Sequence, residues 1–368
     1  MNVSVRTVEL HLAVPFAISR ATHTTKKVVL VELREGDRVS RGEGVPDAFF
    51  GETPESVERH VRSALEVLSE DPFDLEGVGA RLEERFPHGG AASCAIDVLA
   101  HDRASQAAGV TLRDFLGLAG GEPPPTSFTI GIADPSVMAD RAAQAADKGF
   151  SILKVKLGHG DDAAALAAIR ERFSGTIRVD PNAAWTADEA PARIAGLVRF
   201  NLEFVEQPID PEDIDGLRRV REASPLPIVA DEAAIRASDV PRLVGACDGI
   251  NVKLQKCGGV AAARAMIAAA HDRGLKVMLG CRAAETSVAI AAAAHLAPAV
   301  EWRISTAICS SPTIPSAPSP SKTGGSSFQI GRDWARSQRH DIASGRGRGL
   351  RDRAHGVRSR RARAHFER

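Results

Sequence analysis

The stretch "ILKVKLGHGDDAAALAAIRERFSGTIRVDPN", residues 152–182, contains the unit from which most of this chain is built. A β-branched run is followed by an alanine-rich helical stretch and then by the next β-branched run. Such runs follow one another at steps of 25, 24, 27, 24, 22 and 26 residues, beginning at Ser127, Ile152, Thr176, Glu203, Pro227, Gly249 and Leu275. This repeat is typical of parallel strands joined by crossover helices. We therefore predict an α/β fold in which residues 116–302 form a TIM-like (β/α) barrel of seven to eight units, the eighth strand being due near residues 300–307.

Residues 1–115 are predicted to form a separate α+β capping domain. Residues 3–12 ("VSVRTVELHL") and 27–36 ("KVVLVELREG") alternate apolar and polar side chains, as half-buried strands do. Residues 53–70 are expected to form a helix, with Thr53 as its N-cap. A second, alanine-rich helix is expected to end at Gly109.

The composition indicates a soluble globular protein with no transmembrane segment. The chain is 43% hydrophobic and 26% charged, and no apolar run is long enough to span a bilayer. The N-terminal stretch alternates like a strand, so we expect no signal peptide. Five scattered cysteines form no C-x-x-C pair and suit a reducing, cytoplasmic location. The subunit number is left open, a homo-oligomer included.

Residues 303–368 form a basic tail rich in Ser, Pro and Arg. From Arg303 onward there are 14 Lys and Arg against 4 Asp and Glu, whereas residues 1–302 carry 33 basic and 43 acidic residues. The tail has no helical or strand period, so we expect it to be disordered. A basic arm could bind nucleic acid, but this one lacks interleaved aromatic residues, so a nucleic-acid partner is not expected.

Carboxylates end three consecutive predicted strands, at Asp180, Glu206 and Asp231. A single strand-end carboxylate is more often a helix cap or an ion-pair partner. Three that converge at one rim of a barrel repel one another unless a cation lies between them. Oxygen ligands without His or Cys favour Mg²⁺ as that cation.

Lysines end the strands on both sides of this acidic set. Lys154 and Lys156 share one side of the strand before Asp180, and Lys253 follows the strand after Asp231. Lys156 and Lys253 are four strands apart, so we expect them to face each other across the barrel mouth. Two amines on opposite faces of one carbon could remove a proton from one side and return it on the other, which is racemisation or epimerisation.

The motifs "KVKLG", "VDPNAAW", "FVEQP", "VADE" and "NVKLQKCGG", in this order, resemble the muconate-lactonising subgroup of the enolase superfamily. The resemblance covers residues 1–300. It implies that Asp180, Glu206 and Asp231 bind Mg²⁺ and that Lys156 and Lys253 are the two catalytic bases. It also implies that Lys154 assists at the substrate carboxylate.

Within the subgroup the chain is most similar to dipeptide epimerases of the L-Ala-D/L-Glu type. The resemblance implies that Arg20 meets the acidic side chain of the substrate and that Thr129 and Cys281 contact the substrate. Arg20 could instead be an exposed loop residue, and Cys281 a small core residue. The implied function is that of an isomerase, a Mg²⁺-dependent epimerase that removes the proton α to a carboxylate of an acidic dipeptide.

Three other enzymes of the subgroup remain alternatives: an N-acylamino-acid racemase, an o-succinylbenzoate synthase and a muconate cycloisomerase. They share the metal and the lysines, and the substrate would then be another small molecule, such as an acyl amino acid. An alternative of a different class is a non-catalytic remnant whose basic tail binds nucleic acid.

The resemblance has two departures near its C-terminal end. Three residues separate Cys281 from Glu285 where the family has two. The family's epimerases end the eighth strand with an Asp-x-Asp pair that holds the dipeptide ammonium group, whereas residues 303–312 ("RISTAICSSP") contain no acid. We hypothesise that the reading frame of the coding sequence shifts near Arg303. If GC-rich codons encode this stretch, reading it one base earlier can give Asp-Leu-Asp followed by an apolar strand.

Sequencing the gene across codons 280–310 tests this hypothesis. We expect a single-base insertion or deletion in that interval relative to a frame that restores the Asp-x-Asp pair. An intact frame would show that the basic tail is genuine.

Overall fold

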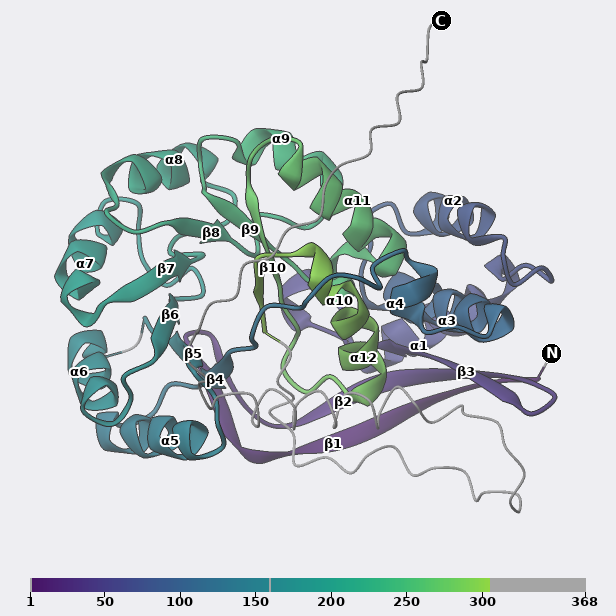
Figure 1. The fold of residues 1–368 in the computed structure, drawn as a ribbon, viewed down its shortest axis with the longest axis horizontal. Coiled ribbons are helices and arrows are strands. Elements are labelled where there is room, and N and C mark those ends of the chain that lie inside the picture. Colours follow the sequence, from purple (N-terminus) through teal and green to yellow (C-terminus); the bar gives the residue numbers. More distant parts are fainter. Residues whose placement is uncertain (1, 159, 305–368) are drawn as a thin grey trace, which may run out of the picture.

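The computed structural model describes residues 2–158 and 160–304 and contains two sheets (Figure 1). The first is a three-stranded antiparallel sheet in the order β1-β2-β3. The second has eight strands in the order β11-β10-β9-β8-β7-β6-β5-β4, all parallel. The predicted fold class, a capping α+β unit beside a TIM-like barrel, is confirmed.

The capping unit is a long hairpin with helices packed on one side. Its strands are β1 (Asn2–Ile18), β2 (Ala21–Glu35) and β3 (Arg38–Gly44). Its helices are η1 (Ala48–Phe50), α1 (Pro54–Ser63), η2 (Leu65–Val67), α2 (Leu75–Arg85), α3 (Ala91–Ala108) and α4 (Leu112–Phe115). As predicted, the Thr53 side chain accepts a hydrogen bond from the Ser56 amide at the start of α1, and Gly109 ends α3 with φ 70°. Helix α1 stops at Ser63, earlier than expected.

Each of the seven predicted barrel strands is present. They are β4 (Phe128–Ile130), β5 (Ile152–Lys156), β6 (Thr176–Asp180), β7 (Leu202–Glu206), β8 (Ile228–Ala230), β9 (Gly249–Val252) and β10 (Lys276–Leu279). Their parallel register places all the carboxyl ends at one rim, the position at which barrels of this class carry their sites.

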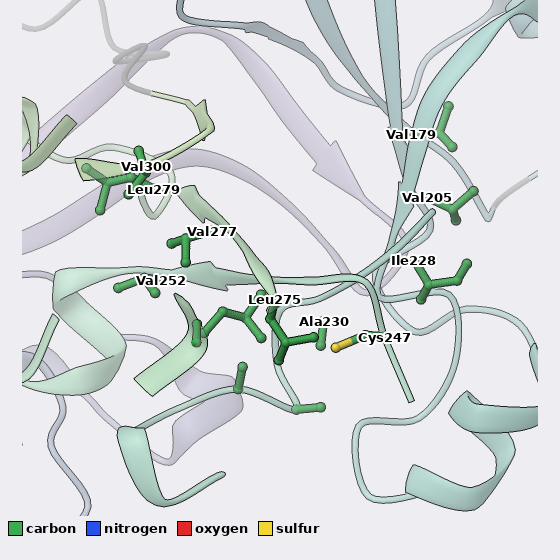
Figure 2. Packing of buried hydrophobic residues seen from close by; sticks show 14 of the residues in the cluster. Val179, Val205, Ile228, Ala230, Cys247, Val252, Leu275, Val277, Leu279 and Val300 are labelled. Atoms are coloured by element: carbon green, nitrogen blue, oxygen red, sulfur yellow. The ribbon is translucent and has the colours of Figure 1, made fainter. Parts of the chain in front are cut away.

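Helices surround the barrel and bury the outer face of its strands. They are α5 (Pro135–Asp147), α6 (Asp162–Arg172), α7 (Ala190–Leu197), η3 (Val198–Phe200), α8 (Ile214–Ala223), η4 (Ala237–Asp239), α9 (Val240–Leu243), α10 (Leu254–Cys257), α11 (Val260–His271), α12 (Ser287–Leu296) and η5 (Ala297–Ala299). Figure 2 shows aliphatic side chains of successive strands in this core, among them Val179, Val205, Ile228, Val252 and Val277.

An eighth strand completes the barrel within residues 300–307, the interval in which the repeat predicts it. Strand β11 (Trp302–Arg303) pairs with β10, and Arg303 forms a parallel bridge with Thr126, just before β4. The Trp302 indole donates a hydrogen bond to Glu203 Oε1 at 3.1 Å and packs against Phe204 inside the barrel. Trp302 and the two residues after it therefore belong to the fold.

The disorder expected for residues 303–368 is wrong for Arg303 and Ile304, which are buried in the barrel. The rest of the tail, including most of the acid-free stretch 303–312, lies outside the described residues. The division at residues 115 and 302 remains a prediction. Across residues 2–158 and 160–304, no helix is both long and apolar enough to cross a membrane.

Buried carboxylates of the capping unit fix it to the barrel. Glu43, at the end of β3, accepts hydrogen bonds from the amides of Thr286 at 2.8 Å and Ala289 at 3.1 Å, where α12 begins. Asp97 in α3 accepts from the Val260 amide at 2.5 Å, where α11 begins. A carboxylate at a helix N-terminus satisfies amides that have no partner within the helix and is favoured by the helix dipole. The capping unit is thus held in one position over the barrel rim.

Candidate active site

The three predicted acidic residues come together at the barrel rim. Asp180 ends β6, Glu206 ends β7, and Asp231 follows β8. Their side chains are almost completely buried, and one oxygen from each lies within 4.8 Å of the others. Such a set of hard oxygen donors around one centre fits a divalent cation such as Mg²⁺.

Lysine ammonium groups surround these carboxylates. Lys154 Nζ lies 2.7 Å from Asp180 Oδ2 and 2.5 Å from Glu206 Oε2. Lys156 Nζ lies 2.6 Å from the same Asp180 oxygen, and Lys253 Nζ lies 2.6 Å from Asp231 Oδ2. Buried charges require this kind of compensation, so the positions of the lysines and the acids depend on one another.

The pKa values of the acids are shifted in different directions. Burial opposes ionisation of Asp180, but the adjacent Lys154 and Lys156 outweigh it and lower its pKa to about 2. Burial and the negative charge of Asp180 raise the pKa of Glu206 to about 7. A cation bound among these carboxylates would favour the ionised form of Glu206 and compete with its proton.

Lys156 and Lys253 approach one cavity from strands four apart, as predicted. Lys156 belongs to β5, Lys253 follows β9, and both line this cavity. Burial lowers the pKa of Lys156. For Lys253, burial opposes the charge, but Asp231 outweighs it, and the pKa is raised. The two amines thus differ in environment, Lys156 sharing Asp180 with Lys154 and Lys253 facing Asp231.

The cavity has a volume of about 390 Å³ and lies between the capping unit and the barrel rim. This volume is typical of small-molecule sites. The remaining predicted contact residues, Arg20, Thr129, Lys154 and Cys281, all line it. Burial raises the pKa of Cys281 to about 12, so its thiol stays protonated and offers a compact, weakly polar wall.

Arg20 reaches the cavity with its charge already paired. Its Nη2 lies 2.6 Å from Glu232 Oε1, and its guanidinium stacks on Phe49 at 4.3 Å. Arg20 therefore links the capping hairpin to the barrel through an ion pair, and its predicted contact with the substrate side chain remains a prediction.

Three site residues were assigned no role from sequence. Lys256 is buried in α10 and donates to Asp231 Oδ1 at 2.7 Å and to three backbone carbonyls. Asn182 accepts from Lys156 at 2.7 Å, and Asn251 donates to Glu206 at 2.8 Å. All three lie inside the motifs quoted above, which was the only available signal for them.

The stretch after Cys281 connects the site to the capping unit. The Arg282 amide donates to Glu285 Oε1 at 2.7 Å, and its guanidinium lies 2.7 Å from Glu52. Ala284 has a positive φ of 69°, a backbone conformation that accommodates the short turn between Cys281 and Glu285.

Comparison with known proteins gives consistent matches over both units. Residues 1–117 match the mandelate racemase / muconate lactonizing enzyme N-terminal domain, and residues 137–311 match the enolase C-terminal domain-like family. The L-Ala-D/L-Glu epimerase of Bacteroides thetaiotaomicron is 37% identical, over 80% of this chain and 76% of that protein. The L-Ala-D/L-amino acid epimerase of a Maribacter species is 34% identical, over 82% and 88%.

A solved structure is similar over the same range. The dipeptide epimerase of Enterococcus faecalis V583, complexed with Mg and the dipeptide L-Leu-L-Tyr, has a TM-score of 0.78 and 34% identity. The match covers 82% of this chain and 88% of that one.

Thermal unfolding with and without Mg²⁺ tests the metal centre. Saturating Mg²⁺ should raise the unfolding midpoint by about 5 °C, because it binds only the folded carboxylate cluster. The increment should be larger at pH 8 than at pH 6, since the proton on Glu206 competes with the ion below a pKa of about 7. Glu206→Gln should lose the increment, whereas Glu212→Gln, at an exposed position, should keep it. If Mg²⁺ raised the unfolding midpoint of Glu206→Gln as much as that of the wild type, Glu206 would not be a ligand of the metal.

Proposed function

The chain belongs to the mandelate racemase / muconate lactonizing enzyme family of the enolase superfamily, and we propose that it is an isomerase that epimerises dipeptides. The observation that carries the proposal is the gathering of three buried carboxylates between two lysines that approach one cavity from opposite strands. Dipeptide epimerases among its relatives support this choice of substrate.

We propose Mg²⁺ as the cofactor, held by Asp180, Glu206 and Asp231. When bound, the ion would withdraw electron density from a substrate carboxylate and so lower the barrier to loss of the adjacent α-proton. Lys154, which bridges Asp180 and Glu206, would stabilise the same substrate carboxylate by hydrogen bonding.

Lys156 and Lys253 are the proposed bases. One would accept the α-proton from one face of the carbon, and the other would deliver a proton to the opposite face. Asn182 fixes Lys156 by accepting a hydrogen bond, and Asp231 fixes Lys253. Inversion at carbon follows from this placement, because neither amine needs to move around the substrate.

Thr129 and Cys281 are proposed to contact the bound dipeptide, since both line the cavity beside the lysines. Arg20 is proposed to anchor the capping hairpin over the substrate through Glu232. The cavity is closed by both structural units, which would limit the access of water during proton transfer.

The preferred substrate is proposed to be an acidic dipeptide of the L-Ala-D/L-Glu type. Turnover by the chain as written is proposed to be slow, because residues 303–312 supply no acid to hold the dipeptide ammonium group. We place the protein in the cytoplasm, because the four cysteines of the described residues are free. N-acylamino-acid racemisation is the second candidate, since a relative is named an N-succinyl-L-Arg/Lys racemase.

Solvent-deuterium exchange at the α-carbon tests this function. With Mg²⁺ in D₂O, L-Ala-L-Glu and L-Ala-D-Glu should both incorporate deuterium, detected as loss of the α-proton signal by NMR. Lys156→Ala and Lys253→Ala should each slow epimerisation by at least about 10²-fold. Each variant should also lose exchange mainly from one epimer, and the two variants should differ in which one.

The rival function has its own outcome in this experiment. Exchange into N-succinyl amino acids but not into dipeptides would identify an acylamino-acid racemase. Exchange that survives both lysine substitutions would contradict the two-base proposal. Lys27→Ala, at an exposed position away from the cavity, should leave all rates unchanged and serves as the control.

A further inference from the structure

One cation lines the cavity without an ion pair. Six other lysines and arginines of the cavity wall are each within 4.0 Å of a carboxylate, namely Arg20, Lys154, Lys156, Lys253, Lys256 and Arg282. Lys26 lines the same cavity and forms no ion pair or hydrogen bond with any residue in the described ranges 2–158 and 160–304. It is half-buried, so its positive charge is partly removed from water with no carboxylate in contact.

The strand alternation of β2 directs Lys26 toward the barrel. Lys26, Val28 and Leu30 share one face of the strand. Val28 and Leu30 pack in a cluster with Val45 and with Ala284 of the barrel. Lys27 lies on the opposite face and is exposed. The sequence of the hairpin therefore presents one of two adjacent lysines to the cavity and the other to solvent.

The neighbours of Lys26 do not neutralise it. Burial lowers the pKa of Lys26, Asp47 opposes this effect, and Arg282 adds to it. Asp47 accepts a hydrogen bond from the Phe49 amide through Oδ1, and its Oδ2 lies 3.8 Å from Arg282 Nε. Its negative charge is thus shared with a second cation, and no carboxylate in the described ranges lies within 4.0 Å of the Lys26 ammonium group.

We propose that Lys26 binds the side-chain carboxylate of the dipeptide residue whose α-carbon is epimerised, and so determines the preference for acidic dipeptides. This inference rests on the proposed function. The α-carboxylate of such a substrate belongs at the metal and Lys154, so a second carboxylate needs a second cation. Arg20, the residue that the sequence suggests for this role, is already paired with Glu232.

The test compares two substrates of almost equal shape, L-Ala-L-Glu and L-Ala-L-Gln. The ratio of their kcat/KM values for α-deuterium exchange in Mg²⁺ measures recognition of the side-chain charge alone. In Lys26→Ala the ratio should fall by about 10- to 100-fold, the usual effect of losing a charged hydrogen bond. Lys27→Ala should keep the wild-type ratio, and both variants should unfold at the wild-type temperature.

Three results separate the inference from the function on which it rests. If Lys26→Ala lowers kcat/KM for L-Ala-L-Glu and for L-Ala-L-Gln by the same factor, or changes neither value, the inference is overturned while the epimerase function stands. If Arg20→Ala, and not Lys26→Ala, changes the ratio, Arg20 is the specificity residue and the inference is likewise overturned. If the wild-type protein exchanges no dipeptide while Mg²⁺ still stabilises it, the proposed function fails, and the inference with it.

Discussion

The structure depends on the mutual compensation of charges that the barrel strands bring to one rim. Asp180, Glu206 and Asp231 are taken out of water at the ends of adjacent strands, where they would repel one another. Lys154, Lys156 and Lys253 contact them at 2.5–2.7 Å. The same contacts that make burial of the acids tolerable also fix the amines against the cavity in which a substrate carbon would lie.

The two structural units contribute different residues to the site. The barrel supplies the three proposed metal ligands and the two proposed bases, which lie at or directly after the carboxyl ends of its parallel strands. The capping hairpin supplies the outer wall, including Arg20 and Lys26. Glu43 and Asp97 accept hydrogen bonds from amides at the N-termini of α12 and α11. These bonds fix the position of the capping unit relative to the two proposed bases.

The sequence predicts those features of the fold and the site that follow from the strand-helix repeat and from the residues at strand ends. Seven strands, the acidic rim and the facing lysines follow from a regular repeat and from strand ends that share one side. The repeat predicts an eighth strand near residues 300–307, but not its bounds at Trp302 and Arg303, because two residues carry no periodicity and only pairing with β10 and Thr126 defines them. The Arg20–Glu232 pair joins residues 212 positions apart, so this ion pair could not be predicted from local motifs.

A crystal structure determined with Mn²⁺ in place of Mg²⁺ tests the central claim most directly, because Mn²⁺ scatters anomalously and takes similar oxygen ligands. The account predicts one anomalous peak within about 2.5 Å of an oxygen of each of Asp180, Glu206 and Asp231, with Lys156 and Lys253 on opposite sides of the adjoining cavity. A peak elsewhere, or ammonium groups still bridging the three carboxylates at saturating Mn²⁺, would contradict it.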